Sequence, residues 1–257
     1  MIASLPMYDR PENAAAHDAL WSLIRDSLSA QGIAAPQTLD RETPHMTGWA
    51  RPDLVLSQIC NLPYRAMFRG KVTLIGAADY GLPDAGPGQY YSQFIVRADD
   101  PATDPAQCTG YRFVLSEPLS QSGWGAPHDW AQAHDHTLTP VLRSGGHRNS
   151  LGALIEGRAD LASIDAITLR NLQRWEPAAQ QIRIIGRTHM TPGMTFITAQ
   201  GHDPAPYFAA IHCAIRALPQ AHRDALGLRG IVALPASAYD IPLPPVPDLP
   251  EQEAIPA

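Results

Sequence analysis

The chain has 257 residues, of which 45% are hydrophobic, so it can bury the core of one large domain or of two smaller ones. Its formal net charge is −6 and it contains no block of lysine or arginine, which argues against nucleic acid or an anionic membrane as its partner. A local anion site remains compatible with this charge, because the N-terminus of a helix binds anions without net positive charge.

The three cysteines, Cys60, Cys108 and Cys213, are widely spaced and odd in number, so they indicate neither a disulfide framework nor a CxxC motif. No apolar run approaches the length that spans a bilayer. The first six residues, MIASLP, lack the basic and long apolar regions of a signal peptide. The sequence as given therefore predicts a cytoplasmic protein, or a periplasmic one whose leader has been removed.

Strands and helices alternate in the first third of the chain. Residues 2–5 read as a short buried strand, and apolar side chains at helical spacing predict a helix from Pro11 to about Ala30, with Gly32 placed to end it. Further buried strands are expected at residues 53–56 and 72–75. This alternation predicts an α/β fold with a largely parallel sheet.

The alternation begins again after a stretch rich in glycine and proline at residues 81–88. Residues 90–97 read as a longer strand, and later strands are predicted at residues 111–115, 140–143, 161–164, 182–185 and 196–199. Helices are expected at residues 126–134, from the turn at 144–147 to about 157, and from about 206 to 218.

These elements fall into two blocks that meet near residues 90–96 and 184–188. Two strand-like crossings between two α/β lobes would form a hinge with a ligand cleft. The expected division is a first lobe from residues 1–92 and 188–242 and a second lobe from residues 93–187. A proline-rich tail at residues 243–257 is expected to have no fixed structure.

Residues 116–127 have the composition of an anion-binding turn. They follow a β-prone run, carry Ser120 and Ser122 on either side of Gln121, and lead into a predicted helix. Such a turn offers free backbone N–H groups, the positive end of the helix dipole and two hydroxyl donors. The alternative is that Ser122 only caps the helix. A second turn of this kind, SGGH at residues 144–147, favours the anion site.

Other polar residues have both a structural and a ligand-binding interpretation. His147 is either a surface histidine or a donor that works even when neutral. Asp165 either caps the next helix or pairs with an ammonium group, which would indicate a zwitterionic ligand or one with a polar tail. Tyr8 and Tyr91 either pack or offer hydroxyl groups to a ligand. Gln58 follows the carboxyl end of a strand, where ligands of α/β proteins bind.

No metal and no cofactor are expected. Three histidines could be proposed as zinc ligands, but they lie on a loop-prone segment and lack a fourth partner at a recognised spacing: His128, His134 and His136.

A serine hydrolase that uses Ser122 and His147 is also disfavoured. Ser120 and Trp124 stand where the two glycines of a Gly-x-Ser-x-Gly elbow would be.

The chain resembles the PhnD-like family of phosphate and phosphonate solute-binding proteins, which have the type 2 periplasmic-binding-protein fold. Five motifs carry the resemblance in order and spacing over about residues 1–240: SLPMY at 4–8, SQSG at 120–123, GGH at 145–147, GRADLASID at 157–165 and TPGM at 191–194. The chain departs from the family pattern where Gln121 replaces a threonine and where Gly146 replaces a serine before His147. From the sequence as given, neither the family's secretion signal nor its lipid-attachment cysteine is expected.

The resemblance implies two α/β lobes joined by a two-strand hinge, with the last part of the chain returning to the first lobe. It implies that the ligand's phosphonate-like head is held by Ser120, the backbone of Gln121, Ser122 and His147. Tyr8 and Asp165 would face the rest of the ligand.

The expected function is non-catalytic binding of a small oxyanion, such as a phosphonate, phosphate or phosphate ester, by hinge closure of a monomer. The partner would be an ABC permease if the protein is exported, whereas a cytoplasmic protein would be a sensor or carrier. The alternative is an enzyme of the same fold that acts on a phosphorylated or heterocyclic metabolite.

Overall fold

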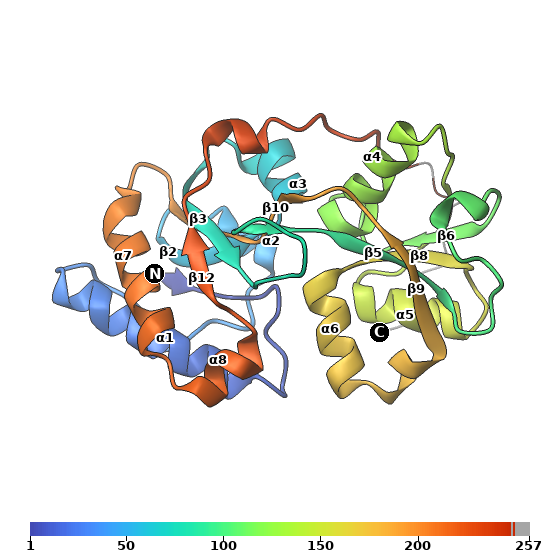
Figure 1. Cartoon of the computed structure of the whole chain (residues 1–257). Coiled ribbons are helices and arrows are strands. Elements are labelled where there is room, and N and C mark those ends of the chain that lie inside the picture. Colours follow the sequence, from blue (N-terminus) through green and yellow to red (C-terminus); the bar gives the residue numbers. More distant parts are fainter. Residues whose placement is uncertain (248, 250–257) are drawn as a thin grey trace. The chain divides into compact units, whose positions relative to one another are not determined.

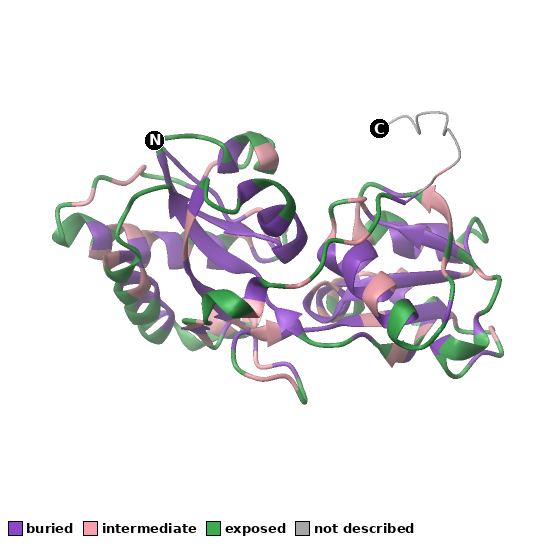
Figure 2. Cartoon of the chain, turned by 90° about the horizontal axis from the view of Figure 1, so that it is seen from above, coloured by how far each residue is buried: buried purple, intermediate pink, exposed green. Residues whose placement is uncertain are grey.

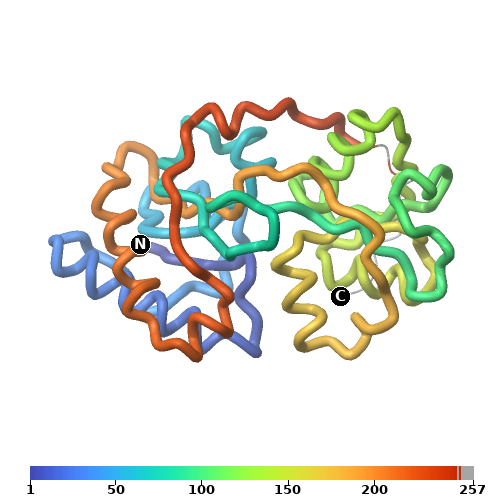
Figure 3. The backbone as a smooth tube through the Cα atoms, viewed as in Figure 1, coloured from blue at the N-terminus to red at the C-terminus, as the bar shows by residue number. Residues whose placement is uncertain are grey.

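The computed structural model describes residues 1–247 and 249, and the chain divides into two compact units (Figure 1). Unit 1 comprises residues 1–90 and 191–241, and unit 2 comprises residues 91–190 together with the described residues from 242 on. The chain therefore passes between the units three times, at 90/91, 190/191 and 241/242 (Figure 3). No helix of the described residues is long and apolar enough to cross a membrane.

Unit 1 contains a five-stranded sheet in the order β1-β2-β11-β3-β12. Its strands are β1 (Ile2–Ala3), β2 (Leu54–Ile59), β3 (Val72–Asp79), β11 (Thr195–Ala199) and β12 (Gly230–Val232). The prediction of a largely parallel sheet is wrong here, because β1 and β2 are the parallel pair and the other pairs are antiparallel. Strand β11 enters between β2 and β3 from far along the chain, and a buried strand is apolar in either direction.

The helices of unit 1 form two groups. Helix α7 packs on β3 and β12, and α1 packs along α7 and α8. In the second group, α2 contributes Trp49 and η1 contributes Phe68 to an apolar core with residues of β1 and β2. The helices are α1 (Ala14–Ala30), α2 (His45–Trp49), α3 (Asn61–Pro63), η1 (Tyr64–Phe68), α7 (Pro204–Ala217), α8 (Gln220–Leu226) and η5 (Ala236–Tyr239). The short strands β4 (Gln89–Tyr90) and β10 (Thr191–Pro192) pair where the chain leaves and re-enters the unit.

Unit 2 contains a five-stranded sheet in the order β7-β6-β8-β5-β9. Its strands are β5 (Ser92–Arg97), β6 (Arg112–Leu115), β7 (Thr139–Arg143), β8 (Leu161–Asp165) and β9 (Ile182–Arg187). Strands β7, β6 and β8 are mutually parallel, whereas β5 runs antiparallel to β8 and β9. Three adjacent parallel strands therefore end at one edge of the sheet.

Helices cover both faces of this sheet. Successive residues of β5 point to opposite faces of the sheet and enter two different apolar cores. Phe94 and Val96 pack in a core with α4, and Ile95 packs in a second core with α5 and α6. The central strands β5, β6 and β8 are largely buried accordingly, whereas the edge strand β7 contains no buried residue (Figure 2). The helices are η2 (Pro105–Gln107), η3 (Gln121–Gly125), α4 (Ala126–Ala133), α5 (His147–Ile155), α6 (Ala166–Trp175) and η4 (Pro177–Gln181). Each of α4, α5 and α6 follows one of the three parallel strands.

The chain after residue 241 includes the start of the proline-rich tail that the sequence predicts. Residues 242–247 contain no helix or strand, but the Trp124 indole N–H donates a 2.8 Å hydrogen bond to the Pro245 carbonyl. The prolines of this segment lack N–H donors but keep their carbonyl acceptors. The segment can therefore be held by hydrogen bonds to its carbonyl groups without joining a sheet. The rest of the predicted tail, residues 248 and 250–257, lies outside the described residues.

Candidate functional site

The first helix start of the site follows β6. The helix begins with η3 at Gln121, earlier than the predicted Ala126, and continues into α4. Ser120 is its N-cap, because the Ser120 hydroxyl accepts a 3.0 Å hydrogen bond from the backbone N–H of Gly123. The sequence left open whether Ser122 caps this helix. The cap is Ser120, and the Ser122 hydroxyl points to other partners.

Two buried serines hold this turn in place. The Ser163 hydroxyl, on β8, donates a 2.8 Å hydrogen bond to the carbonyl of Ser122. Ser116 lies so close to Gly123 that a Cβ added to the glycine would fall 2.1 Å from the Ser116 Oγ and 3.1 Å from its backbone nitrogen. Gly123 is therefore required by close packing, not by a left-handed backbone.

The second helix start follows β7. Gly145 has a φ of +81°, and Gly146 precedes α5 without a side-chain cap, so His147 is the first residue of the helix. The Ser144 hydroxyl braces this turn through a 2.9 Å hydrogen bond to the Gly146 carbonyl and a 2.7 Å contact with the Ser150 hydroxyl. The backbone N–H of Gly145 also donates to the Ser116 carbonyl, which ties the two turns together.

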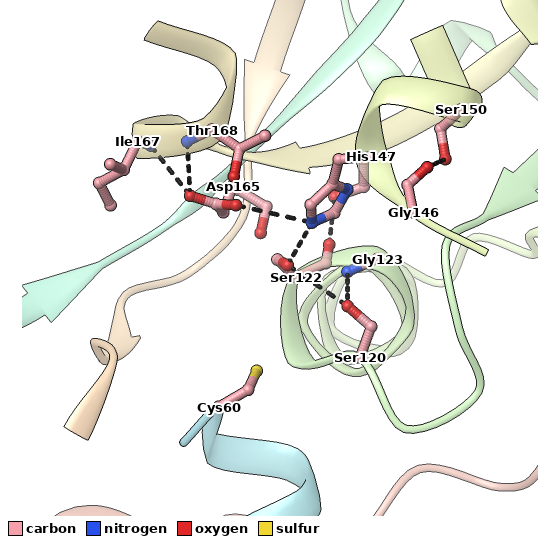
Figure 4. A network of polar contacts seen from close by, with 12 residues as sticks. Cys60, Ser120, Ser122, Gly123, Gly146, His147, Ser150, Asp165, Ile167 and Thr168 are labelled. Carbon is pink, nitrogen blue, oxygen red and sulfur yellow. Dashed lines mark hydrogen bonds and ion pairs between the residues drawn. The ribbon is translucent and has the colours of Figure 1, made fainter. Parts of the chain in front are cut away.

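The two helix starts meet in the contact between Ser122 and His147. The Ser122 Oγ lies 2.7 Å from the Nε2 of His147, and the Oδ2 of Asp165 lies 3.6 Å from the same nitrogen (Figure 4). The His147 side chain is 14% exposed and that of Asp165 is 2% exposed. Hydroxyl, imidazole and carboxylate groups from the ends of three parallel strands thus form one contact chain, as expected at the carboxyl edge of such a sheet.

Asp165 has a structural role as well. Its Oδ1 accepts hydrogen bonds from the backbone N–H groups of Ile167 at 3.0 Å and Thr168 at 2.8 Å, which makes Asp165 the N-cap of α6. The predicted helix cap is therefore confirmed. Because one carboxylate oxygen caps the helix while the other faces His147, capping and a role toward a ligand are compatible.

Burial lowers the pKa of His147 below its usual value, although the nearby carboxylate of Asp165 acts in the opposite direction. The imidazole is thus neutral at pH 7, and a neutral imidazole donates from one nitrogen and accepts at the other. Among the described residues, Nδ1 has no hydrogen-bond partner. The ring can therefore present one N–H toward Ser122 or toward an anion beside it.

The lowered pKa of His147 predicts how stability depends on pH. In the native state the group binds fewer protons than in the unfolded state, so the free energy of unfolding should fall as pH drops below about 6.5 and should be fully restored above it. Replacing the group in a His147→Asn variant should flatten this dependence. Urea unfolding of both proteins between pH 5 and pH 8 measures it, and parallel curves would contradict the prediction.

The contact chain does not form a catalytic triad. In a triad the base binds the nucleophile through one ring nitrogen and the orienting carboxylate through the other. Here both Ser122 and Asp165 face Nε2 of His147. The carboxylate therefore does not hold the ring as a base for the hydroxyl.

Three other predicted site residues are not part of this contact chain. Tyr8 and Gln58 belong to unit 1, where the Tyr8 ring packs edge-on against Tyr80 at 5.1 Å and the Gln58 amide donates to the Tyr80 hydroxyl at 3.4 Å. They line a cavity of about 10 Å³, room for one water molecule. Tyr91 lies in unit 2, and the Arg187 guanidinium is 5.2 Å from its ring. Ligand roles for these three residues remain predictions.

The sequence interpretation missed Ser163 and Tyr80. The position of Ser163 could have been predicted from that of Asp165, because the two lie two residues apart on one strand and such side chains point to the same face of the sheet. Tyr80 directly follows β3, but a tyrosine next to a glycine-rich stretch gives no sign of its partners.

The histidines near α4 pack against an aromatic ring. His134 stacks on Trp130 with ring centres 4.3 Å apart, and His136 packs against the same indole at 5.7 Å. Within residues 1–247 and 249, no group of three or more histidine, cysteine, aspartate or glutamate residues could hold a metal ion.

Solved structures share this fold. PhnD1 from Prochlorococcus marinus (MIT 9301), in complex with methylphosphonate, is 14% identical with a TM-score of 0.69, and the match covers 93% of each chain. A binding protein component of an ABC phosphonate transporter from Pseudomonas aeruginosa is also 14% identical, with a TM-score of 0.63 over 93% of this chain and 82% of that one. XAC2383 from Xanthomonas citri, bound to chloride, is 16% identical with a TM-score of 0.63 over 93% and 92%.

Among curated proteins no match to the chain was found. The matches to solved structures establish a periplasmic-binding-protein fold of two lobes. One family model, described as the phosphonate periplasmic substrate-binding protein of ABC transporters, matches residues 4–239. This span contains both helix starts and Asp165, and members of the family are normally periplasmic and bind solutes without catalysis. The chain belongs to this family of ABC-transporter substrate-binding proteins.

Proposed function

We propose that unit 2 binds the anionic head of a phosphonate or a phosphate ester at the helix starts around Ser122 and His147. The observation that carries the proposal is the 2.7 Å contact between the Ser122 Oγ and the His147 Nε2, which brings two helix N-termini to one place. Backbone N–H groups, helix dipoles and these two donors together suit an oxyanion.

The charges near the site favour a ligand that carries little net negative charge or its own hydrogen-bond donor. The arginines that flank the second turn already have carboxylate partners: Arg143 pairs with Glu117, and Arg148 pairs with Glu176. The carboxylate of Asp165 faces the histidine and would repel a bare dianion. A protonated phosphonate, or one with an ammonium group, would place a donor against this oxygen.

Calorimetry with methylphosphonate, a phosphate monoester, methanesulfonate and acetate tests the proposal. We expect saturable binding of one phosphonate or phosphate ester per chain, a thermal upshift with ligand, and no product after prolonged incubation. A ligand at 100 times its Kd should add about 2.7 kcal/mol to the free energy of unfolding. Failure of every phosphorus compound to bind would refute the proposal, and product formation would favour the enzyme alternative.

The Asp165→Asn variant separates the two roles of this residue. Asparagine can still cap α6, so stability should change little, whereas dianionic sulfate should bind about tenfold more tightly and an aminoalkylphosphonate about tenfold more weakly. The Asp165→Ala variant should also lose the cap, at a cost of about 1 kcal/mol in unfolding free energy. Calorimetry and urea unfolding measure both effects. Equal changes in affinity for the two ligands would contradict the role of the carboxylate.

We infer that the partner of the loaded protein is an ABC permease, on the strength of the family match over residues 4–239. Hinge closure and the monomeric state remain predictions. A ligand with higher affinity for one arrangement of the units would shift the population toward it.

A further inference from the structure

A proline-rich strap, residues 242–247, lies on the helix that opens the anion site. It shares the lining of a cavity of about 260 Å³ with α4 and the start of β7. Its lining includes Trp124, His128, Pro245 and Pro247. Leu249, just beyond the strap, packs against the apolar core that contains Trp124. The strap therefore belongs to the packed surface of unit 2.

The contact between Trp124 and Pro245 resembles the way aromatic grooves recognise proline-rich peptides. Such segments keep an extended backbone at low entropic cost and offer carbonyl acceptors, while aromatic rings supply flat walls and an indole donor. Here the indole N–H donates to the Pro245 carbonyl at 2.8 Å. The indole is 4% exposed and also packs against His128, with ring centres 5.4 Å apart.

The chain immediately before the strap is anchored in unit 1. The Arg65 guanidinium donates to the Ile241 carbonyl, and Arg69 pairs with Asp240 at 2.7 Å. Three residues separate Ile241 from Pro245. Because the strap is short and belongs to the same chain, its docking on Trp124 is intramolecular and orders few residues.

Trp124 connects the strap to the anion site. It belongs to η3, directly after Gly123 and two residues after Ser122. Its backbone N–H donates to the Ser120 carbonyl at 3.0 Å, so it forms part of the same helical turn as the proposed donors. An indole held by Pro245 restrains this turn in addition to Ser163, which donates to the Ser122 carbonyl.

We propose that residues 242–247 are a positioning strap, whose docking on Trp124 keeps the first helix start of the anion site in its binding geometry. The inference rests on the proposed function of that site and adds a control element to it. Release of the strap should loosen η3 and weaken anion binding, although no strap residue need touch the ligand.

The test compares two tryptophans that make the same bond. The Trp21 indole, in unit 1, donates to the Pro36 carbonyl at 3.2 Å and is 1% exposed, so Trp21→Phe is a matched control for Trp124→Phe. A nitroxide at Val246→Cys, where the native side chain is 85% exposed, reports docking of the strap by its mobility. Cys213→Ser removes the exposed native thiol. Calorimetry with methylphosphonate measures affinity in the same proteins.

We expect Trp124→Phe to mobilise the nitroxide and to weaken methylphosphonate binding about 2- to 10-fold, the range for loss of one hydrogen bond. Trp21→Phe should do neither, even if it lowers stability. Pro245→Gly, which leaves η3 unchanged but loosens the strap backbone, should mobilise the label and weaken binding to a smaller degree.

A nitroxide that stays immobile in Trp124→Phe would overturn the proposal. So would a mobile nitroxide with unchanged affinity, and in that case the proposed anion site would still stand. Failure of every phosphorus compound to bind the unsubstituted protein would overturn the proposed function and the strap's role together. The nitroxide mobility and the ligand affinity together therefore distinguish failure of the strap's role from failure of the proposed anion site.

Discussion

Gly123→Ala is expected to destroy most of the anion affinity of unit 2 and to destabilise the fold. The added methyl group would lie 2.1 Å from the Ser116 Oγ and 3.1 Å from the Ser116 backbone nitrogen. The serine hydroxyl could rotate away, but the backbone could not, so η3 must shift from the end of β6. Overpacking of this kind costs about 1–3 kcal/mol. Because Ser122 moves with the turn, affinity for methylphosphonate should fall at least about tenfold, equivalent to about 1.4 kcal/mol.

Gly152→Ala is the matched control for this substitution. Gly152 lies within α5, and a methyl group there would meet only the Glu156 carboxylate, at 3.9 Å. The variant should bind methylphosphonate normally and gain up to about 1 kcal/mol from helix propensity. Urea unfolding and calorimetry on both variants provide the comparison. Normal affinity in Gly123→Ala would show that the position of η3 does not govern binding.

Ser122→Ala is expected to weaken head-group binding by about 1–3 kcal/mol, or roughly 5- to 150-fold, the cost of one lost charge-assisted hydrogen bond. The Ser122 hydroxyl does not serve as the helix cap, because Ser120 caps the helix. The substitution also removes the 2.7 Å partner of the His147 Nε2. Calorimetry with methylphosphonate measures the loss.

Ser163→Ala is the control for Ser122→Ala. It removes a buried hydroxyl that donates to the Ser122 carbonyl rather than one that faces the histidine. This variant should lose stability, by about 1 kcal/mol, but less affinity than Ser122→Ala. The reverse order of affinities, or no loss in Ser122→Ala, would contradict the assignment of Ser122 as a ligand donor.

The sequence predicted the part of the fold that periodicity and turn chemistry determine. The strands of unit 2 and the starts of α5 and α6 were predictable because apolar runs end at glycine, serine or aspartate. The direction of β11 and the three-residue β12 were not predictable, since pairing of distant segments leaves no mark on a short apolar run. The early start of η3 was also hidden, because Gly123 and Gly125 lower helix propensity, and the Ser120 cap and the close approach of Gly123 to Ser116 are contacts that a propensity scale does not include.

The candidate site was predictable in outline for a topological reason. Ser122, His147 and Asp165 each follow or end one of three parallel strands, and such ends lie at one edge of a sheet. The sequence could not reveal that both the serine and the aspartate face the same histidine nitrogen, because that depends on side-chain rotamers. Nor could it reveal the strap, because its composition alone is typical of a tail without fixed structure.

Backbone amide NMR shifts during a methylphosphonate titration show whether the ligand's head lies at the two helix starts of unit 2. We predict that the largest saturable shifts occur at the amides of Ser122, Gly123 and His147, with one common Kd. Saturable binding whose shifts leave these three amides unchanged would contradict the account.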